Sequence, residues 1–214
     1  MKKILLIFIA SFICGSAFAQ SKTEKGIDYG LKAGINLAKY HLSNEAAGTE
    51  TKNITNFQLT GYLNAPLGSS FYLQPGLSLQ GKGGKNRIAT NEQKQNTMWM
   101  EIPLNLLVKL PAAPKAHIFV GGGPYLGLAL SGKNKLTTNG QTTESDVNFG
   151  NAVSDNLKGS DFGFNLMAGI QMDSGLNLGI GHGIGVKNIT PNNANAVVSD
   201  IYSRVLSFSV GFQF

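Results

Sequence analysis

Apolar and polar residues alternate along eight separate stretches of this 214-residue chain, and this period of two is the feature that most restricts its fold. The last stretch shows it most clearly, because Phe208, Val210, Phe212 and Phe214 take every second place up to the final residue. Such alternation is typical of a β-strand with one apolar face and one polar face. The stretches lie at about residues 29–37, 57–65, 71–80, 98–110, 118–130, 162–170, 176–186 and 208–214.

The connections between these stretches alternate in length. Residues 40–53, 82–97, 131–160 and 188–202 are long and polar, whereas 66–70, 111–116 and 173–175 are short turns with Pro or Gly. Long loops on one side and short turns on the other are typical of outer-membrane barrels, whose short turns face the periplasm. Lipid also tolerates no open sheet edge, so we expect the last strand to pair with the first. The sequence therefore predicts an all-β fold, an eight-stranded antiparallel up-and-down transmembrane β-barrel.

The N-terminus has the features of an export signal. Lys2 and Lys3 precede an apolar run over residues 4–13, and Ala17-Phe18-Ala19 forms a small-x-small cleavage pattern. We therefore expect a signal peptide at 1–19, a barrel domain at 20–214 and localisation in the outer membrane, with an uncleaved anchor as the alternative. The charged fraction of 14% is low against the roughly 25% of soluble domains, which fits a chain whose outer surface meets lipid.

Several short motifs resemble those of a known family. Gly30-Leu-Lys-Ala-Gly-Ile-Asn36, Glu101-Ile-Pro103, Gly123-Pro-Tyr-Leu-Gly127 and Gly185-Val-Lys-Asn-Ile189, with the terminal Phe214, are similar to the eight-stranded outer-membrane proteins of Bacteroidota called "porin family" or PorT-like. The resemblance covers essentially all of the chain after residue 19. It implies insertion by the barrel-assembly machinery, with Phe214 as part of the assembly signal. One type of member assists a secretion system, so a secretion-complex partner is also possible.

Four charged residues fall on the polar face of the predicted strands: Lys32, Glu101, Lys109 and Lys187. Eight strands enclose an interior just wide enough for side chains. We therefore expect a charge network that fills the lumen together with Tyr62, Tyr72, Trp99 and Tyr125. A selective conduit built on the same charges is the alternative.

The predicted loop 82–97 carries four cations against one acidic residue, Glu92; the cations are Lys82, Lys85, Arg87 and Lys94. Outside the cell such a patch could contact lipopolysaccharide or acidic glycans, although a merely solvated loop has the same composition. His182 falls on the apolar face between Ile180 and Ile184. A bulge that turns it inward, or a neutral imidazole tolerated in lipid, explains it more simply than lipid-modifying chemistry.

No catalytic constellation, nucleotide-binding loop or metal-ligand spacing is present in the sequence. We therefore expect no enzyme activity, no cofactor and no nucleic-acid partner. The preferred function is an integral outer-membrane barrel with a surface-binding or structural role, in contact with outer-membrane lipid and lipopolysaccharide. A narrow pore and an accessory subunit of a secretion complex remain as alternatives.

Overall fold

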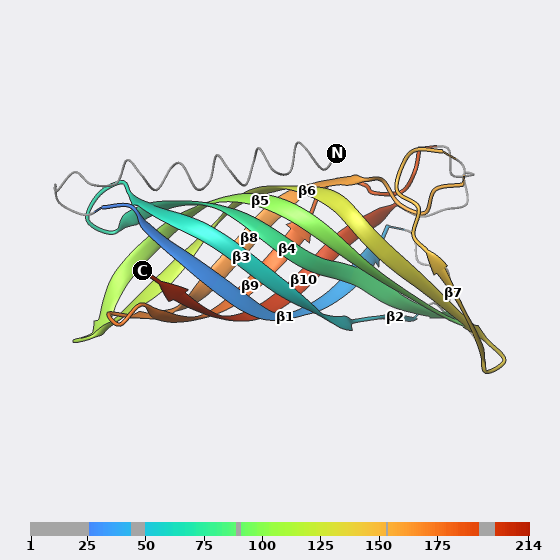
Figure 1. Cartoon of the computed structure of the whole chain (residues 1–214), viewed down its shortest axis with the longest axis horizontal. Coiled ribbons are helices and arrows are strands. Elements are labelled where there is room, and N and C mark those ends of the chain that lie inside the picture. The colour runs from blue at the N-terminus through green and yellow to red at the C-terminus, as the bar shows by residue number, and fades with distance from the viewer. Residues whose placement is uncertain (1–25, 44–49, 89–90, 153, 193–199) are drawn as a thin grey trace.

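Ten antiparallel strands form the sheet in the computed structural model, which describes residues 26–43, 50–88, 91–152, 154–192 and 200–214 (Figure 1). Eight of them pair as neighbours in chain order and close into a barrel: β1 (Asp28–Leu42), β3 (Ile54–Pro66), β4 (Phe71–Ile88), β5 (Asn91–Ala113), β6 (Ala116–Thr138), β8 (Ser160–Met172), β9 (Leu176–Gly185) and β10 (Ile201–Gln213). The predicted eight-stranded up-and-down barrel is confirmed. The predicted signal peptide lies outside the described residues.

The ring closes between the first and last barrel strands. β1 pairs with β10 over most of its length, from Gly30 opposite Gln213 to Leu42 opposite Ile201. The backbone N–H of Phe214 continues the ladder by donating to the Tyr29 carbonyl at 2.8 Å. The end of the chain is therefore part of the barrel wall, because its backbone groups pair with β1.

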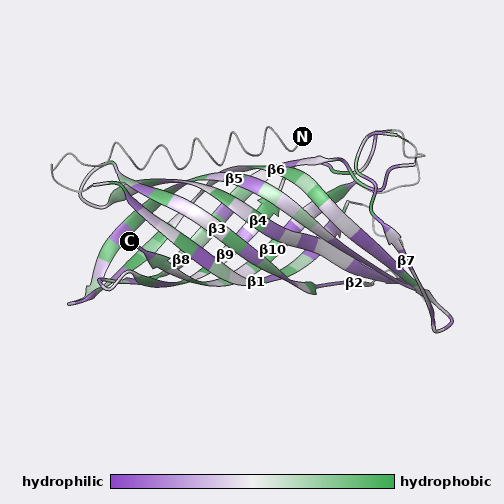
Figure 2. Ribbon diagram, in the orientation of Figure 1, coloured by the Kyte–Doolittle hydropathy of each residue, from purple (hydrophilic) through white to green (hydrophobic). Residues whose placement is uncertain are grey.

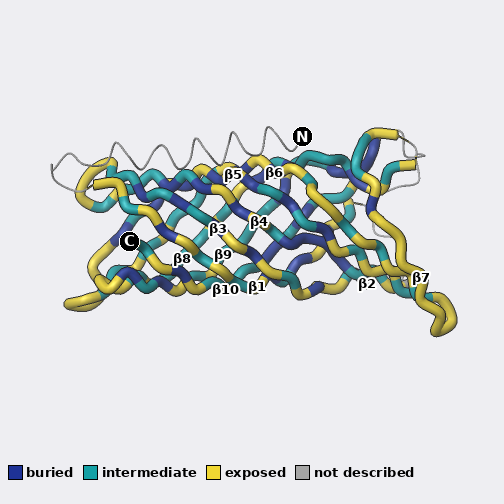
Figure 3. Tube along the Cα trace, in the orientation of Figure 1, coloured by how far each residue is buried: buried dark blue, intermediate teal, exposed yellow. Residues whose placement is uncertain are grey.

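The two faces of the wall differ in chemistry, as the alternation requires. Leu, Ile, Val and Phe side chains point outward and form an exposed apolar band. In Figure 2 the hydrophobic residues of this band appear as green segments between paler and purple ones along the strands. The inward positions carry buried polar and aromatic side chains, and buried and exposed residues alternate along the strands in Figure 3. Among the described residues, no helix is long and apolar enough to cross a membrane.

Three barrel strands continue well past the apolar band on one side. There β4 also pairs with the short strand β2 (Glu50–Lys52), and β6 also pairs with β7 (Gln141–Asp146). Residues 82–97 and 131–138, predicted to be loops, are therefore mostly strand. The apolar alternation stops at the edge of the band because a sheet surrounded by water can be polar on both faces. The backbone groups nevertheless keep pairing beyond that edge.

Candidate functional site

A buried ion cluster crosses the lumen toward the end that carries the β2–β7 extension. Lys82 of β4 places its Nζ 2.6 Å from Oε1 of Glu101 on β5 and 2.7 Å from Oδ2 of Asp161 on β8. The hydroxyls of Tyr125 and Ser203 both donate to Asp161, at 3.1 and 2.8 Å. All five residues are buried. Buried charges have to be paired and hydrogen-bonded, and here one cation lies between two carboxylates.

Aromatic and aliphatic residues cover this cluster on its outer side. The Trp99 indole is fully buried and donates to Thr97 at 2.9 Å, and the Lys82 ammonium lies 5.4 Å from its ring. Tyr40, which contacts Thr97, packs in an apolar cluster with Val147, Leu157 and Ile189. The ion cluster and the apolar cluster together occupy this end of the described lumen.

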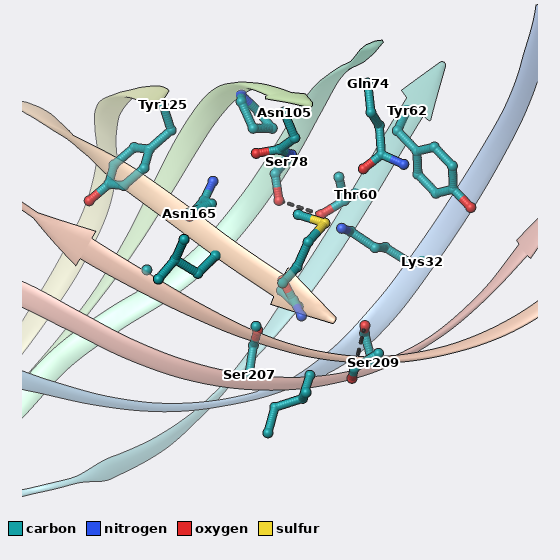
Figure 4. A pocket seen from close by; sticks show the side chains of 18 of the residues that line it. Lys32, Thr60, Tyr62, Gln74, Ser78, Asn105, Tyr125, Asn165, Ser207 and Ser209 are labelled. Carbon is teal, nitrogen blue, oxygen red and sulfur yellow. Dashed lines mark hydrogen bonds between the residues drawn. The ribbon is translucent and has the colours of Figure 1, made fainter. Parts of the chain in front are cut away.

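A small cavity lies further along the lumen. Its volume is about 80 Å³, which accommodates only a few water molecules. Lys32 points into it, beside Thr60 and Ser78, which share a hydrogen bond (Figure 4). Within the described chain the Lys32 ammonium makes no hydrogen bond and no ion pair; its contact is with the Tyr62 ring, 5.8 Å away. This part of the lumen can therefore hold ordered water but no solute of sugar size.

A second polar network lies at the opposite, short-turn end of the lumen, where its residues line a cavity of about 500 Å³. The Lys109 Nζ donates to Gln171 at 2.7 Å and lies 4.5 Å from the centre of the Tyr72 ring. It also contacts Gln213, which in turn donates to Asp28 at 2.7 Å. Polar networks thus lie at both ends of the described lumen.

The four predicted lumen charges do not form one network. Lys32, Glu101 and Lys109 do point into the lumen but lie at different levels, and only Glu101 belongs to the ion cluster. Lys187 lies beyond the end of β9, where it donates to the Ser160 hydroxyl at 2.6 Å. The prediction that Lys187 belongs to a lumen network is therefore wrong. β9 ends at Gly185, two residues before Lys187, and the Lys187 ammonium contacts Ser160 rather than another lumen charge.

The sequence reasoning missed the two partners of Glu101. Every second residue of β4 points inward, and Lys82 follows Gln74, Ser78 and Gln80 in this series. Asp161 lies one residue before the alternation that begins at Phe162. Extending each strand beyond its last apolar residue would have found both. The prediction that Lys82 belongs to an external basic loop is wrong, because this residue is only 2% exposed and lies inside the barrel.

The rest of the predicted basic patch does lie outside the barrel. Lys85, Arg87 and Lys94 fall on the outward face of β4 and β5, beyond the apolar band. Glu92 pairs with Lys85 at 2.5 Å and with Arg87 at 2.6 Å, and these hydrogen bonds lower the pKa of its carboxyl group. In the register, Lys94 stands between Lys85 and Lys135, and it forms no ion pair within the described chain.

His182 points away from the lumen. The pairing register is regular on both sides of it, opposite Leu166 on β8 and Leu206 on β10, so no bulge turns it inward. Its imidazole therefore lies on the apolar outer wall.

Aromatic side chains gather at the short-turn end of the barrel. There the Phe214 ring stacks on Tyr29, with ring centroids 5.4 Å apart, and meets Phe212 edge-on at 5.1 Å.

Comparison with known proteins identifies the barrel. The family model described as "Outer membrane protein beta-barrel domain" matches residues 18–192. The fold is similar to Neisserial surface protein A (11% identity, 89% of this chain and 100% of that chain covered, TM-score 0.45). It is also similar to the attachment invasion locus protein Ail of Yersinia pestis (10%, 87% and 98%, 0.44) and to OprG of Pseudomonas aeruginosa (10%, 87% and 95%, 0.43). No curated protein sequence matches the chain significantly. The chain is an integral outer-membrane β-barrel protein and belongs to the family of outer membrane protein beta-barrel domains.

Proposed function

We propose that this protein is a non-enzymatic surface protein of the outer membrane that acts through its external sheet and loops rather than through its lumen. The observation that supports this proposal is the ion cluster of Lys82, Glu101 and Asp161, which crosses the lumen under an apolar cover. A solute would have to break this cluster to pass. The strands β4, β5 and β6, by contrast, continue outward and present a polar sheet to the cell exterior.

The outward face of that sheet supplies a possible binding surface. Lys85, Lys94 and Lys135 lie side by side in the register of β4, β5 and β6. Like charges at directly opposite positions destabilise a sheet, so an anionic ligand over the unpaired Lys94 would relieve the repulsion. We propose lipopolysaccharide or an acidic glycan as this ligand, with Lys85, Arg87 and Lys94 in contact.

The resemblance to the Bacteroidota "porin family" or PorT-like proteins supports two further partners. The barrel-assembly machinery is proposed to read the C-terminal strand that ends in Phe214. An accessory role in a secretion complex is the second candidate function, since it would use outer surfaces and needs no open lumen. A pull-down from outer membranes in mild detergent distinguishes a lone barrel from a complex subunit.

Conductance measurements test the sealed lumen directly. Full-length refolded protein in planar bilayers is expected to give no steady current, and proteoliposomes are expected to admit no sugar-sized solute. The double variant Trp99→Ala/Tyr125→Ala removes two large buried side chains and serves as the comparison that should conduct. Reproducible large currents from pure wild-type protein would overturn the proposal in favour of a pore.

A further inference from the structure

Two cations lie side by side on the outer wall at the closing seam of the barrel. Lys39 of β1 and Arg204 of β10 are direct cross-strand partners. Both point outward, because their chain neighbours Ala38, Tyr40 and Ser203 are buried inside. Like charges in this relationship cost stability unless something compensates for them. Neither cation has a carboxylate within ion-pair distance among the described residues.

The height of this pair on the wall is set by the apolar band. On both strands the next outward residue toward the membrane is a leucine, Leu37 on β1 and Leu206 on β10. Two residues of strand rise about 6.6 Å, so at a tilt of about 40° the cations lie roughly 5 Å above the last apolar pair. The headgroup region on each side of a bilayer is about 5–7 Å thick. The cations are therefore level with the lipid headgroups of the outer leaflet.

An aromatic pair occupies the next outward position. His41 and Tyr202 are cross-strand partners, with ring centroids 6.4 Å apart and planes tilted by 38°. From the membrane outward, the seam thus presents two leucines, then two cations, then two rings. Lipid A likewise places phosphate groups and sugar rings together, directly above its acyl chains, because the acyl chains and the phosphates are attached to the same disaccharide.

We propose that Lys39 and Arg204 bind a phosphate group of a glycolipid in the outer leaflet, with His41 and Tyr202 against its sugar. One guanidinium nitrogen of Arg204 donates to the carbonyls of Gly185 and Ser203, at 2.6 and 2.9 Å, which holds the planar group in place. Its remaining donors suit a phosphate, and Lys39 adds a second, more mobile charge.

The direction of approach favours a lipid over a soluble glycan. The four polar side chains point sideways from the barrel wall rather than toward its open end. A ligand that moves within the plane of the membrane meets them directly. The inference needs the outer-membrane location and the orientation with the long loops outside, and it is independent of the proposed role of Lys85, Arg87 and Lys94.

Titration of detergent-solubilised, folded full-length protein with lipid A tests the inference, with bound lipid counted by native mass spectrometry. Wild-type protein should bind bisphosphorylated lipid A on the order of tenfold or more tightly than dephosphorylated lipid A, since each cation near an anionic headgroup contributes about fivefold. The variant Lys39→Gln/Arg204→Gln should lose this preference, and the exchange variant Lys39→Arg/Arg204→Lys should keep it. Inorganic phosphate at millimolar concentration should not displace the lipid.

The matched control is Lys115→Gln/Lys133→Gln, which also removes two positive charges. Lys115 is exposed at a short turn, and Lys133 lies on the β6 extension, where it pairs with Asp146. This control should bind lipid A like the wild type. Equal wild-type affinity for the two forms of lipid A would overturn the inference, and that comparison requires no variant to fold. An equal loss of affinity in the control would overturn it too, because net charge rather than the seam would then bind the lipid.

Discussion

The Lys82 ammonium on β4 lies 2.7 Å from the Asp161 carboxylate on β8, across the lumen from one wall of the barrel to another. These strands are not neighbours in the sheet, since β5 and β6 lie between them. The ion pair therefore links parts of the wall that no ladder of backbone hydrogen bonds joins directly. Two carboxylates, Asp161 and Glu101, thus lie around one cation in a buried part of the lumen.

Replacing Lys82 should destabilise the folded barrel strongly. Lys82→Met keeps most of the length of the side chain but leaves Glu101 and Asp161 buried without their cation, and breaking a buried pair in this way costs about 3–5 kcal/mol. Lys85→Met is the matched control, because its pair with Glu92 lies at the surface, where solvent screening leaves an ion pair little effect on stability. Denaturant unfolding of the refolded proteins, followed by the heat-sensitive gel shift, measures both. Similar losses for the two variants would contradict a structural role for the cluster.

Sequence alternation was sufficient to predict the barrel but not the full length of its strands. Within the membrane, inward polar residues alternate with outward apolar residues. The strand segments from Phe71 to Leu79 and from Met98 to Leu110 can therefore be predicted from the sequence. Beyond the band both faces are polar and the pattern disappears, although the backbone still pairs. Lys82 lies at this transition, so the sequence pattern predicts a loop residue where the structure has a residue of the lumen.

Long-range partners could not be predicted either. The contact of Lys82 with Asp161 depends on the curvature of the closed barrel, which brings inward side chains of distant strands together. One local signal was overlooked: Asn139-Gly140 joins β6 to β7, and both residues have positive φ, 51° and 80°. Asn-Gly is the preferred pair for such a two-residue hairpin turn.

The carboxyl group of Glu92 should titrate below the usual glutamate range. Hydrogen bonds from Lys85 and Arg87 lower its pKa, so its ion pairs are present above about pH 4.3 and are lost only as the pH falls through the lowered value. NMR titration of carbon-labelled glutamate in the micelle-bound protein reads this midpoint. In Lys85→Met/Arg87→Met the midpoint should return to about 4.3; an unchanged midpoint would show that the two cations do not hold Glu92.

Epitope tags should report the orientation of the barrel in the membrane. A tag between Asn139 and Gly140 lies in the turn of the long external hairpin and should bind antibody on intact cells. A tag at Ala113, the last residue of β5 before the short turn, should become accessible only after the outer membrane is permeabilised. Surface labelling at Ala113 on intact cells would reverse the orientation.

Changes at Phe214 should act mainly on assembly in the cell. Its ring lies on the outer wall, exposed and stacked on Tyr29, where aspartate costs only about 0–1 kcal/mol near a membrane interface. If the assembly machinery reads the terminal aromatic residue, Phe214→Asp should greatly reduce folded barrel in outer-membrane fractions while refolding in detergent stays near the wild-type yield. The gel shift of folded barrels measures both.

Tyr29→Ala separates recognition of Phe214 from its packing. It removes the same ring stack but leaves the terminal residue intact, as well as the backbone hydrogen bond from Phe214 to residue 29 at 2.8 Å. This variant should assemble in cells almost as well as the wild type. If Phe214→Asp lost folded barrel equally in cells and in detergent, and Tyr29→Ala showed the same losses, Phe214 would instead have a structural role. Normal levels of folded Phe214→Asp protein in cells would refute the assembly role, because a lost signal cannot leave insertion unchanged.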